Sequence, residues 1–169
     1  MNTPRVLVID AGLGNIGSVV SALQRNECCV ERSKFPISPE AIQNFSHVVL
    51  PGVGSFAYGM NVLESSGWKS WILGAWCLSG KPLLGICLGM QLLATEGSEG
   101  APSDSYVPGL DLIPGSVQRL EAHPALLLPH VGWNELHWRD PEIDIARGVP
   151  NGGDMYFVHS YIFRPNDPS

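Results

Sequence analysis

The feature that most constrains this fold is a cysteine held between two glycines at the end of an apolar run. Residues 82–93 read Pro-Leu-Leu-Gly-Ile-Cys-Leu-Gly-Met-Gln-Leu-Leu, which places Cys87 in a Gly-x-Cys-x-Gly arrangement. Glycines two positions to either side allow a strand-to-helix turn that is too tight for bulky neighbours. The pattern therefore predicts a strand over residues 83–86, a sharp turn at Cys87 and a helix after it.

A turn of this kind gives the Cys87 side chain a chemical role. The sulfur would project into a cleft at a helix N-terminus, where the peptide dipole favours the thiolate over the thiol. The N–H of Leu88 would point toward an oxyanion formed beside the sulfur. A lone cysteine is usually a small buried core residue, but the two glycines, the strand and the helix favour a nucleophile. We predict covalent acyl transfer through Cys87.

Strand-like and helix-like segments alternate along the first half of the chain. Four segments read as strands: residues 5–10, 28–32, 45–50 and 83–86. Residues 18–25 and 60–78 carry apolar positions at helical spacing. The alternation predicts a three-layer α/β fold with a mostly parallel sheet and functional loops at the carboxyl ends of the strands.

The second half of the chain differs from the first in composition. Glycine, proline and serine become frequent after Gly97, and residues 116–120 alternate between polar and apolar side chains. Residues 155–163 read Met-Tyr-Phe-Val-His-Ser-Tyr-Ile-Phe, which predicts one late strand. We expect some antiparallel strands in this half, and one domain over residues 1–169.

Composition excludes several classes of function. Ten basic and sixteen acidic side chains leave a net charge of −6, which argues against nucleic acid or an anionic membrane as the main partner. No apolar run is long enough to span a bilayer. The four cysteines show neither zinc-ligand nor disulfide spacing. We therefore expect reduced thiols, a cytoplasmic location, no metal and no cofactor.

Two glycine-rich loops follow strands in the first half. Residues 51–55, Pro-Gly-Val-Gly-Ser, would let main-chain amides approach a ligand beside Cys87, although an ordinary turn explains them equally well. Gly12, Gly14 and Gly17 with Glu31 formally match a dinucleotide-binding fingerprint. The cysteine turn and the lack of a second mononucleotide-binding half argue against that alternative.

The motifs together resemble one family of enzymes. Residues 85–91, Gly-Ile-Cys-Leu-Gly-Met-Gln, are similar to the nucleophile motif of the class I glutamine amidotransferases. Residues 12–16, 51–56, 129–134 and 156–161 narrow the resemblance to the glutaminase subunits of imidazole glycerol phosphate synthase, which belong to histidine biosynthesis. The match is collinear from Ile9 to Phe163.

The resemblance implies a flavodoxin-like sheet and hydrolysis of L-glutamine through a glutamyl thioester on Cys87. It assigns the oxyanion hole to the N–H groups of Val53 and Leu88. It further implies a set of residues that hold the amino-acid end of glutamine: Gly52, Gln91, His159, Ser160 and Tyr161.

The same resemblance implies a partner. Glutaminase subunits of this family form a heterodimer with a (β/α)8-barrel cyclase subunit, which receives the ammonia through a protected passage. Asn15 and Trp133 fall in segments that face the barrel in that family.

The sequence departs from the family at the general base. The family supplies the proton-shuttling imidazole and its orienting acid from a late His-Pro-Glu motif, and a cysteine hydrolase of this type needs both. Here His123-Pro124 is followed by Ala125, and His159 falls among the substrate contacts. About thirty residues of a family member have no counterpart. We expect a C-terminally truncated glutaminase with turnover lowered by orders of magnitude.

Three alternatives remain open at this point. The chain is a non-catalytic relative that only docks on a synthase partner, or it supplies ammonia to a synthase of another pathway. In the third, His159 is recruited as a substitute base. Labelling of Cys87 by a glutamine-mimicking electrophile separates a live thiolate from a scaffold.

Overall fold

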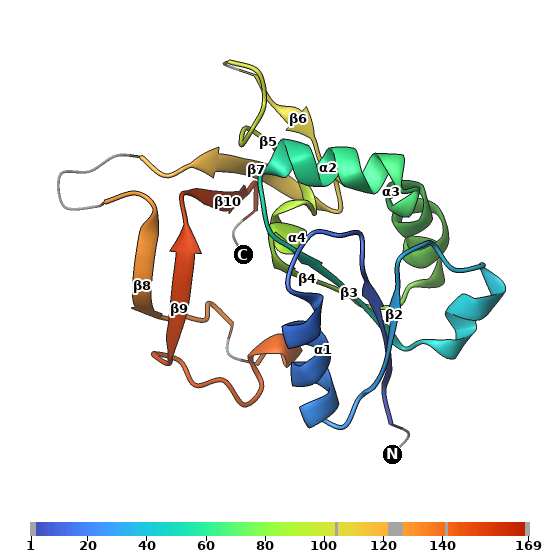
Figure 1. Cartoon of the computed structure of the whole chain (residues 1–169). Helices are drawn as coiled ribbons and strands as arrows, with labels where there is room; N and C mark the ends of the chain where they lie inside the picture. The colour runs from blue at the N-terminus through green and yellow to red at the C-terminus, as the bar shows by residue number, and fades with distance from the viewer. Residues whose placement is uncertain (1–2, 104, 122–126, 141, 168–169) are drawn as a thin grey trace.

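The computed structural model describes residues 3–103, 105–121, 127–140 and 142–167 (Figure 1). Its central sheet has four parallel strands in the order β2-β1-β3-β4. Their bounds are β1 Arg5–Ile9, β2 Cys29–Ser33, β3 His47–Gly52 and β4 Leu83–Cys87. The order is that of the flavodoxin-like doubly wound sheets, as expected.

Helices cover both faces of this sheet because successive residues of a strand point to opposite sides. Val6 and Val8 of β1 pack with helix α1 (Ile16–Arg25), while Leu7 and Ile9 belong to the larger core on the other face. Helix α2 (Phe56–Ser65) lies over that second face (Figure 1). The expected three layers are therefore confirmed.

The helix expected over residues 60–78 is interrupted. Gly67 adopts φ +79°, which ends α2 and starts α3 (Trp68–Trp71) in a new direction. A π-helical stretch, Ile72–Trp76, and a 3₁₀ turn, Cys77–Ser79, follow. Further 3₁₀ turns occur at Glu40–Asn44 and Asp144–Ala146.

Three tryptophans close the core under these helices. Trp68 and Trp76 are fully buried, and Trp71 lies between them with ring centroids 5.2 and 5.7 Å away. The indole N–H groups of Trp68 and Trp71 donate to the carbonyl oxygens of Lys34 and Ile37. These bonds fix the segment after β2 against the helices.

The second half forms two smaller sheets. One has the order β10-β7-β5-β6, in which β5 and β7 are parallel and the other pairs antiparallel. The other is the antiparallel hairpin β8-β9, which stands apart from the central sheet (Figure 1). Their bounds are β5 Ala94–Gly97, β6 Val107–Pro108, β7 Ile113–Arg119, β8 His130–Glu135, β9 Asp154–His159 and β10 Tyr161–Pro165.

The prediction of a single strand over residues 155–163 is wrong, because the structure has two strands there. The chain turns at Ser160, so that β9 pairs with β8 and β10 pairs with β7 in a different sheet. Apolar and aromatic residues lie on both sides of Ser160, so the sequence carries no clear sign of this change. The corner places His159, Ser160 and Tyr161 beside the end of β4.

The central sheet is open beside β4. Within the residues that the structure describes, β4 pairs with β3 alone, and Leu84 and Ile86 on it are 41% and 36% exposed. Val19 and Leu23 of α1 line the shallow apolar groove next to them. Among the described residues, no helix has the length and apolarity needed to cross a bilayer.

Candidate active site

Cys87 occupies the sharp turn that its sequence predicts. It is the last residue of β4, and helix α4 (Leu88–Gln91) begins directly after it. Its φ is +54°, an uncommon and strained backbone conformation for a residue with a side chain. The side chain is exposed. The helix is only one turn long, shorter than the apolar run after Cys87 suggests.

The two flanking glycines are required by close packing. A Cβ on Gly85 would collide with the main chain of Met90, and a Cβ on Gly89 would collide with the carbonyl oxygen of Leu50. Gly52 is constrained in the same way, because its Cβ would lie 2.8 Å from the Gly89 nitrogen. Gly52 therefore packs against the turn, and it is not among the residues that line the cavity beside Cys87.

Most of the candidate site residues meet in one cavity of about 320 Å³ beside the Cys87 side chain. The candidates that line it are Val53, Cys87, Leu88, Gln91, His159, Ser160 and Tyr161. A second, mostly apolar hollow of about 590 Å³ also borders Cys87, between α4 and strands β9 and β10. Cys87 is thus reachable from two sides.

The Gln91 side chain ties α4 to the corner at Ser160. Its amide Nε2 donates to the Tyr161 carbonyl oxygen at 3.3 Å. The same oxygen lies 3.0 Å from His159 Nδ1, which must carry a proton to make this bond. Helix α4 and the β9–β10 corner are therefore held together by main-chain and side-chain groups that line the cavity.

The two candidate oxyanion donors differ in availability. Leu88 opens α4, and the first N–H groups of a helix have no intrahelical acceptor. The Val53 N–H instead donates to the Leu13 carbonyl oxygen at 2.6 Å. Gly14 lies against Val53, since a Cβ there would be 3.5 Å from the Val53 nitrogen. In this conformation the Val53 N–H is committed to the first glycine loop.

Sequence reasoning missed Glu99, whose side chain completes the wall of the cavity. Burial raises the pKa of the Glu99 carboxyl above its ordinary value, and a hydrogen bond from the Phe56 N–H opposes that shift. Glu99 follows β5 in a Gly-Ser-Glu-Gly segment without any motif of its own. Only the sheet that carries β5 past α2 brings it to Cys87.

The hydrogen bonds of His159 argue against the alternative in which this residue serves as a substitute base. Its Nδ1 is bonded to the Tyr161 carbonyl, and its Nε2 lies 3.0 Å from His130 Nδ1. His159 would have to give up one of these bonds to take a proton from Cys87. His123, Pro124 and Ala125 lie outside the described residues.

The two candidate partner-facing residues lie away from the cavity lining. Asn15 is exposed at the start of α1, where its side-chain oxygen accepts the Ser18 N–H at 3.3 Å. Trp133 of β8 is 69% exposed and packs edge-on against Tyr156 of β9. In the described part of the chain, no three His, Cys, Asp or Glu side chains are grouped as a metal site would need.

Comparison with known families agrees with this geometry. The family model described as "Glutamine amidotransferase class-I" matches residues 7–169. A solved structure described as that of a glutamine amidotransferase superposes with a TM-score of 0.65 at 19% identity, over 94% of this chain and 73% of the other. A second, of a GMP synthase subunit from Thermoplasma acidophilum, gives 0.66 at 17% identity, over 96% and 68%. At these identities the structures show the fold.

Two curated proteins are more similar in sequence. Imidazole glycerol phosphate synthase subunit HisH 1 of Prochlorococcus marinus is 49% identical over 99% of this chain and 76% of its own length. Subunit HisH of the same synthase from Gloeobacter violaceus is 39% identical, over 96% of this chain and 68% of its own length.

Proposed function

This chain belongs to the class I glutamine amidotransferase family, and we propose that it is a glutaminase subunit of an imidazole glycerol phosphate synthase. The observation that carries the proposal is Cys87, an exposed thiol at φ +54° that opens into a cavity lined by Leu88, Gln91 and Tyr161. The printed names of the similar proteins supply the synthase.

The reaction begins with the Cys87 thiolate. It attacks the side-chain carboxamide carbon of glutamine, and the carbonyl electrons move onto the oxygen. Collapse of this tetrahedral state breaks the C–N bond while the nitrogen takes up the proton that the Cys87 thiol released, so that ammonia leaves and a thioester remains. Water then hydrolyses the thioester to glutamate and free Cys87.

Hydrogen bonds to the developing oxyanion lower the barrier to both steps. Leu88 offers its N–H from the first turn of α4. Val53 offers a second only after its N–H leaves the Leu13 carbonyl oxygen, to which it is bonded at 2.6 Å. We therefore assign Val53 to the oxyanion hole in a conformation different from the present one.

The amino-acid end of glutamine is assigned to the part of the cavity that Gln91 and the β9–β10 corner line. Gln91 and the main chain from His159 to Tyr161 supply polar groups to it, and Gly52 contributes only by letting β3 pack closely against the turn. The α-ammonium group needs an anionic partner, and the Glu99 carboxylate lines this cavity. We propose that Glu99 accepts the ammonium.

The general base is not assigned to any side chain of this cavity, because both nitrogens of His159 are bonded. We accordingly expect thioester formation to exceed turnover in these 169 residues. The cytoplasmic location, the lyase and heterodimer assignment, and the absence of nucleic acid or membrane partners stay predictions. Asn15 and Trp133 are proposed to contact the barrel cyclase.

The test is covalent labelling with 6-diazo-5-oxo-L-norleucine, a glutamine mimic with an electrophilic carbon, followed by mass spectrometry. We expect one label per chain, on Cys87, and none in Cys87→Ser. Cys77→Ser is the matched control and should be labelled like the unchanged protein. Labelling spread over the other cysteines, or unchanged in Cys87→Ser, would overturn the proposal. Ammonia release with and without the cyclase subunit then measures turnover.

A further inference from the structure

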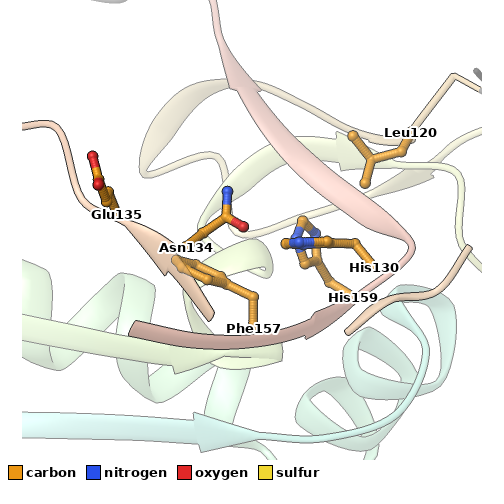
Figure 2. A pocket seen from close by; sticks show the side chains of 6 residues that line it. All are labelled: Leu120, His130, Asn134, Glu135, Phe157 and His159. Carbon is orange, nitrogen blue, oxygen red and sulfur yellow. The ribbon is translucent and has the colours of Figure 1, made fainter. Parts of the chain in front are cut away.

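Two histidine rings meet across the hairpin (Figure 2). Trp133 and Tyr156 pair three positions further along, so their side chains point to the opposite face. His130 and His159 are paired in register, and their rings are 5.1 Å apart at 84°. His130 Nδ1 lies 3.0 Å from His159 Nε2. They line a cavity of about 290 Å³ with Asn134 and Phe157, and of these four residues His159 alone also lines the 320 Å³ cavity beside Cys87.

The hydrogen-bond partners determine which ring nitrogens carry protons. The Tyr161 carbonyl can only accept, so His159 Nδ1 carries a hydrogen and donates it at 3.0 Å. In a neutral His159 ring the other nitrogen, Nε2, then has a free lone pair. His130 must therefore donate its own Nδ1–H to that lone pair. Both rings are Nδ1–H tautomers.

This order of donors connects β8 to the glutamine cavity. His130 donates to His159, His159 donates to the Tyr161 carbonyl, and Gln91 donates to the same carbonyl from α4. Gln91 and Tyr161 both line the cavity beside Cys87, whereas His130 does not. Three hydrogen bonds thus run from the hairpin to the wall that is proposed to hold the substrate.

We propose that His130 is a positioning residue for the glutamine site. By donating to His159 Nε2 it fixes the orientation and tautomer of that ring, as an outer partner does for an imidazole that acts on another group. The fixed ring holds the Ser160–Tyr161 corner where Gln91 can reach it. This inference rests on the proposed glutaminase function and deepens it.

The first arm of the test measures binding apart from chemistry. Labelling of Cys87 by 6-diazo-5-oxo-L-norleucine is followed as a function of its concentration. In His130→Leu we expect the half-saturating concentration to rise roughly threefold to tenfold, since one net hydrogen bond is lost. The maximal labelling rate should stay unchanged, because Cys87 and α4 are untouched. A threefold to tenfold fall in the maximal labelling rate, with an unchanged half-saturating concentration, would overturn the proposal.

Two variants separate positioning from general loss of structure. His130→Asn keeps an amide N–H near the Nδ1 position and should restore half-saturation to within about twofold of the unchanged protein. His137→Leu removes another histidine, whose ring is 74% exposed, and should have no effect. Failure of His130→Asn to bind better than His130→Leu would overturn the proposal.

The second arm does not depend on glutamine chemistry. Nitrogen-15 NMR of the histidine rings should show both His130 and His159 as Nδ1–H tautomers, and the His159 ring proton should exchange slowly with solvent. Exchange should accelerate in His130→Leu and not in His137→Leu. An Nε2–H tautomer at His159 would refute the proposed order of hydrogen-bond donors. An unchanged exchange rate of the His159 ring proton in His130→Leu would refute it as well. Failure of Cys87 labelling with these NMR results intact would instead refute the glutaminase function.

Discussion

The central sheet and the β8-β9 hairpin use apolar side chains in opposite ways. In β1 every side chain from Val6 to Ile9 is buried, alternately in the two cores. In the hairpin, Trp133 and Tyr156 stack edge-on and are both more than half exposed. Strands β1 and β3 at the centre of this sheet are stabilised by their own packing, whereas the apolar surface of the hairpin fits an interaction with another protein.

Removing one tryptophan from each region tests this difference most directly. Trp68→Ala deletes a fully buried indole and its bond to the Lys34 carbonyl, and should lower the free energy of unfolding by about 3–5 kcal/mol. Trp133→Ala removes a mostly exposed ring, and we expect a change within about 0.5 kcal/mol. Urea unfolding followed by circular dichroism measures both.

The same pair separates stability from association. If Trp133 faces the cyclase subunit, Trp133→Ala should weaken binding about thirtyfold, equivalent to about 2 kcal/mol at an interface hot spot. Isothermal titration calorimetry with the purified cyclase measures the change. If Trp133→Ala loses as much stability as Trp68→Ala, the hairpin is a packed part of the fold and does not differ from the central sheet in this respect.

The central sheet and the turn at Cys87 could be predicted from sequence because their signals are local. A strand buried on both faces is a nearly continuous apolar run, and the turn needs glycine at fixed offsets from Cys87. Glu99 and His130 could not be found in this way. Each reaches its place through strand pairing between distant segments, and neither carries a local signature of that pairing.

The main-chain conformation sets a second limit on sequence reasoning. The motif around Val53 predicts a donor near the oxyanion, but the peptide N–H is bonded to the Leu13 carbonyl in this structure. Residue types do not report which way a glycine-flanked peptide points, because glycine permits several orientations at similar energy. The division of residues 155–163 at Ser160 is missed for a related reason, since both strands are rich in the same β-forming apolar and aromatic residues.

A third prediction compares a glycine that packs against the central sheet with one in the hairpin. Gly89→Ala places a methyl group against the Leu50 carbonyl oxygen in the central sheet and should cost about 1–3 kcal/mol of stability. Gly132→Ala in β8 meets nothing within 4 Å and should change stability by less than about 0.5 kcal/mol. Thermal unfolding of the two variants checks this. Equal costs would mean that the hairpin packs as tightly as the turn.

The smallest effect concerns Cys77, at the end of the helical segments that cover the central sheet. Burial raises the pKa of the Cys77 thiol, so its thiolate fraction at about pH 8 is lower than that of an ordinary cysteine. A variant that keeps Cys77 alone, with Cys28, Cys29 and Cys87 changed to serine, should react with iodoacetamide several times more slowly than one that keeps Cys29 alone.

The pH profile gives the sign of this effect. As pH rises, the Cys77 rate should climb with a midpoint above about 8.5, the ordinary cysteine value. Adding the cyclase subunit should leave that profile unchanged, because Cys77 belongs to the region that is stabilised by its own packing. A midpoint at or below the ordinary value would show that the partial burial of the Cys77 thiol does not disfavour its thiolate. A shift on adding the cyclase would show that docking reaches beyond the hairpin.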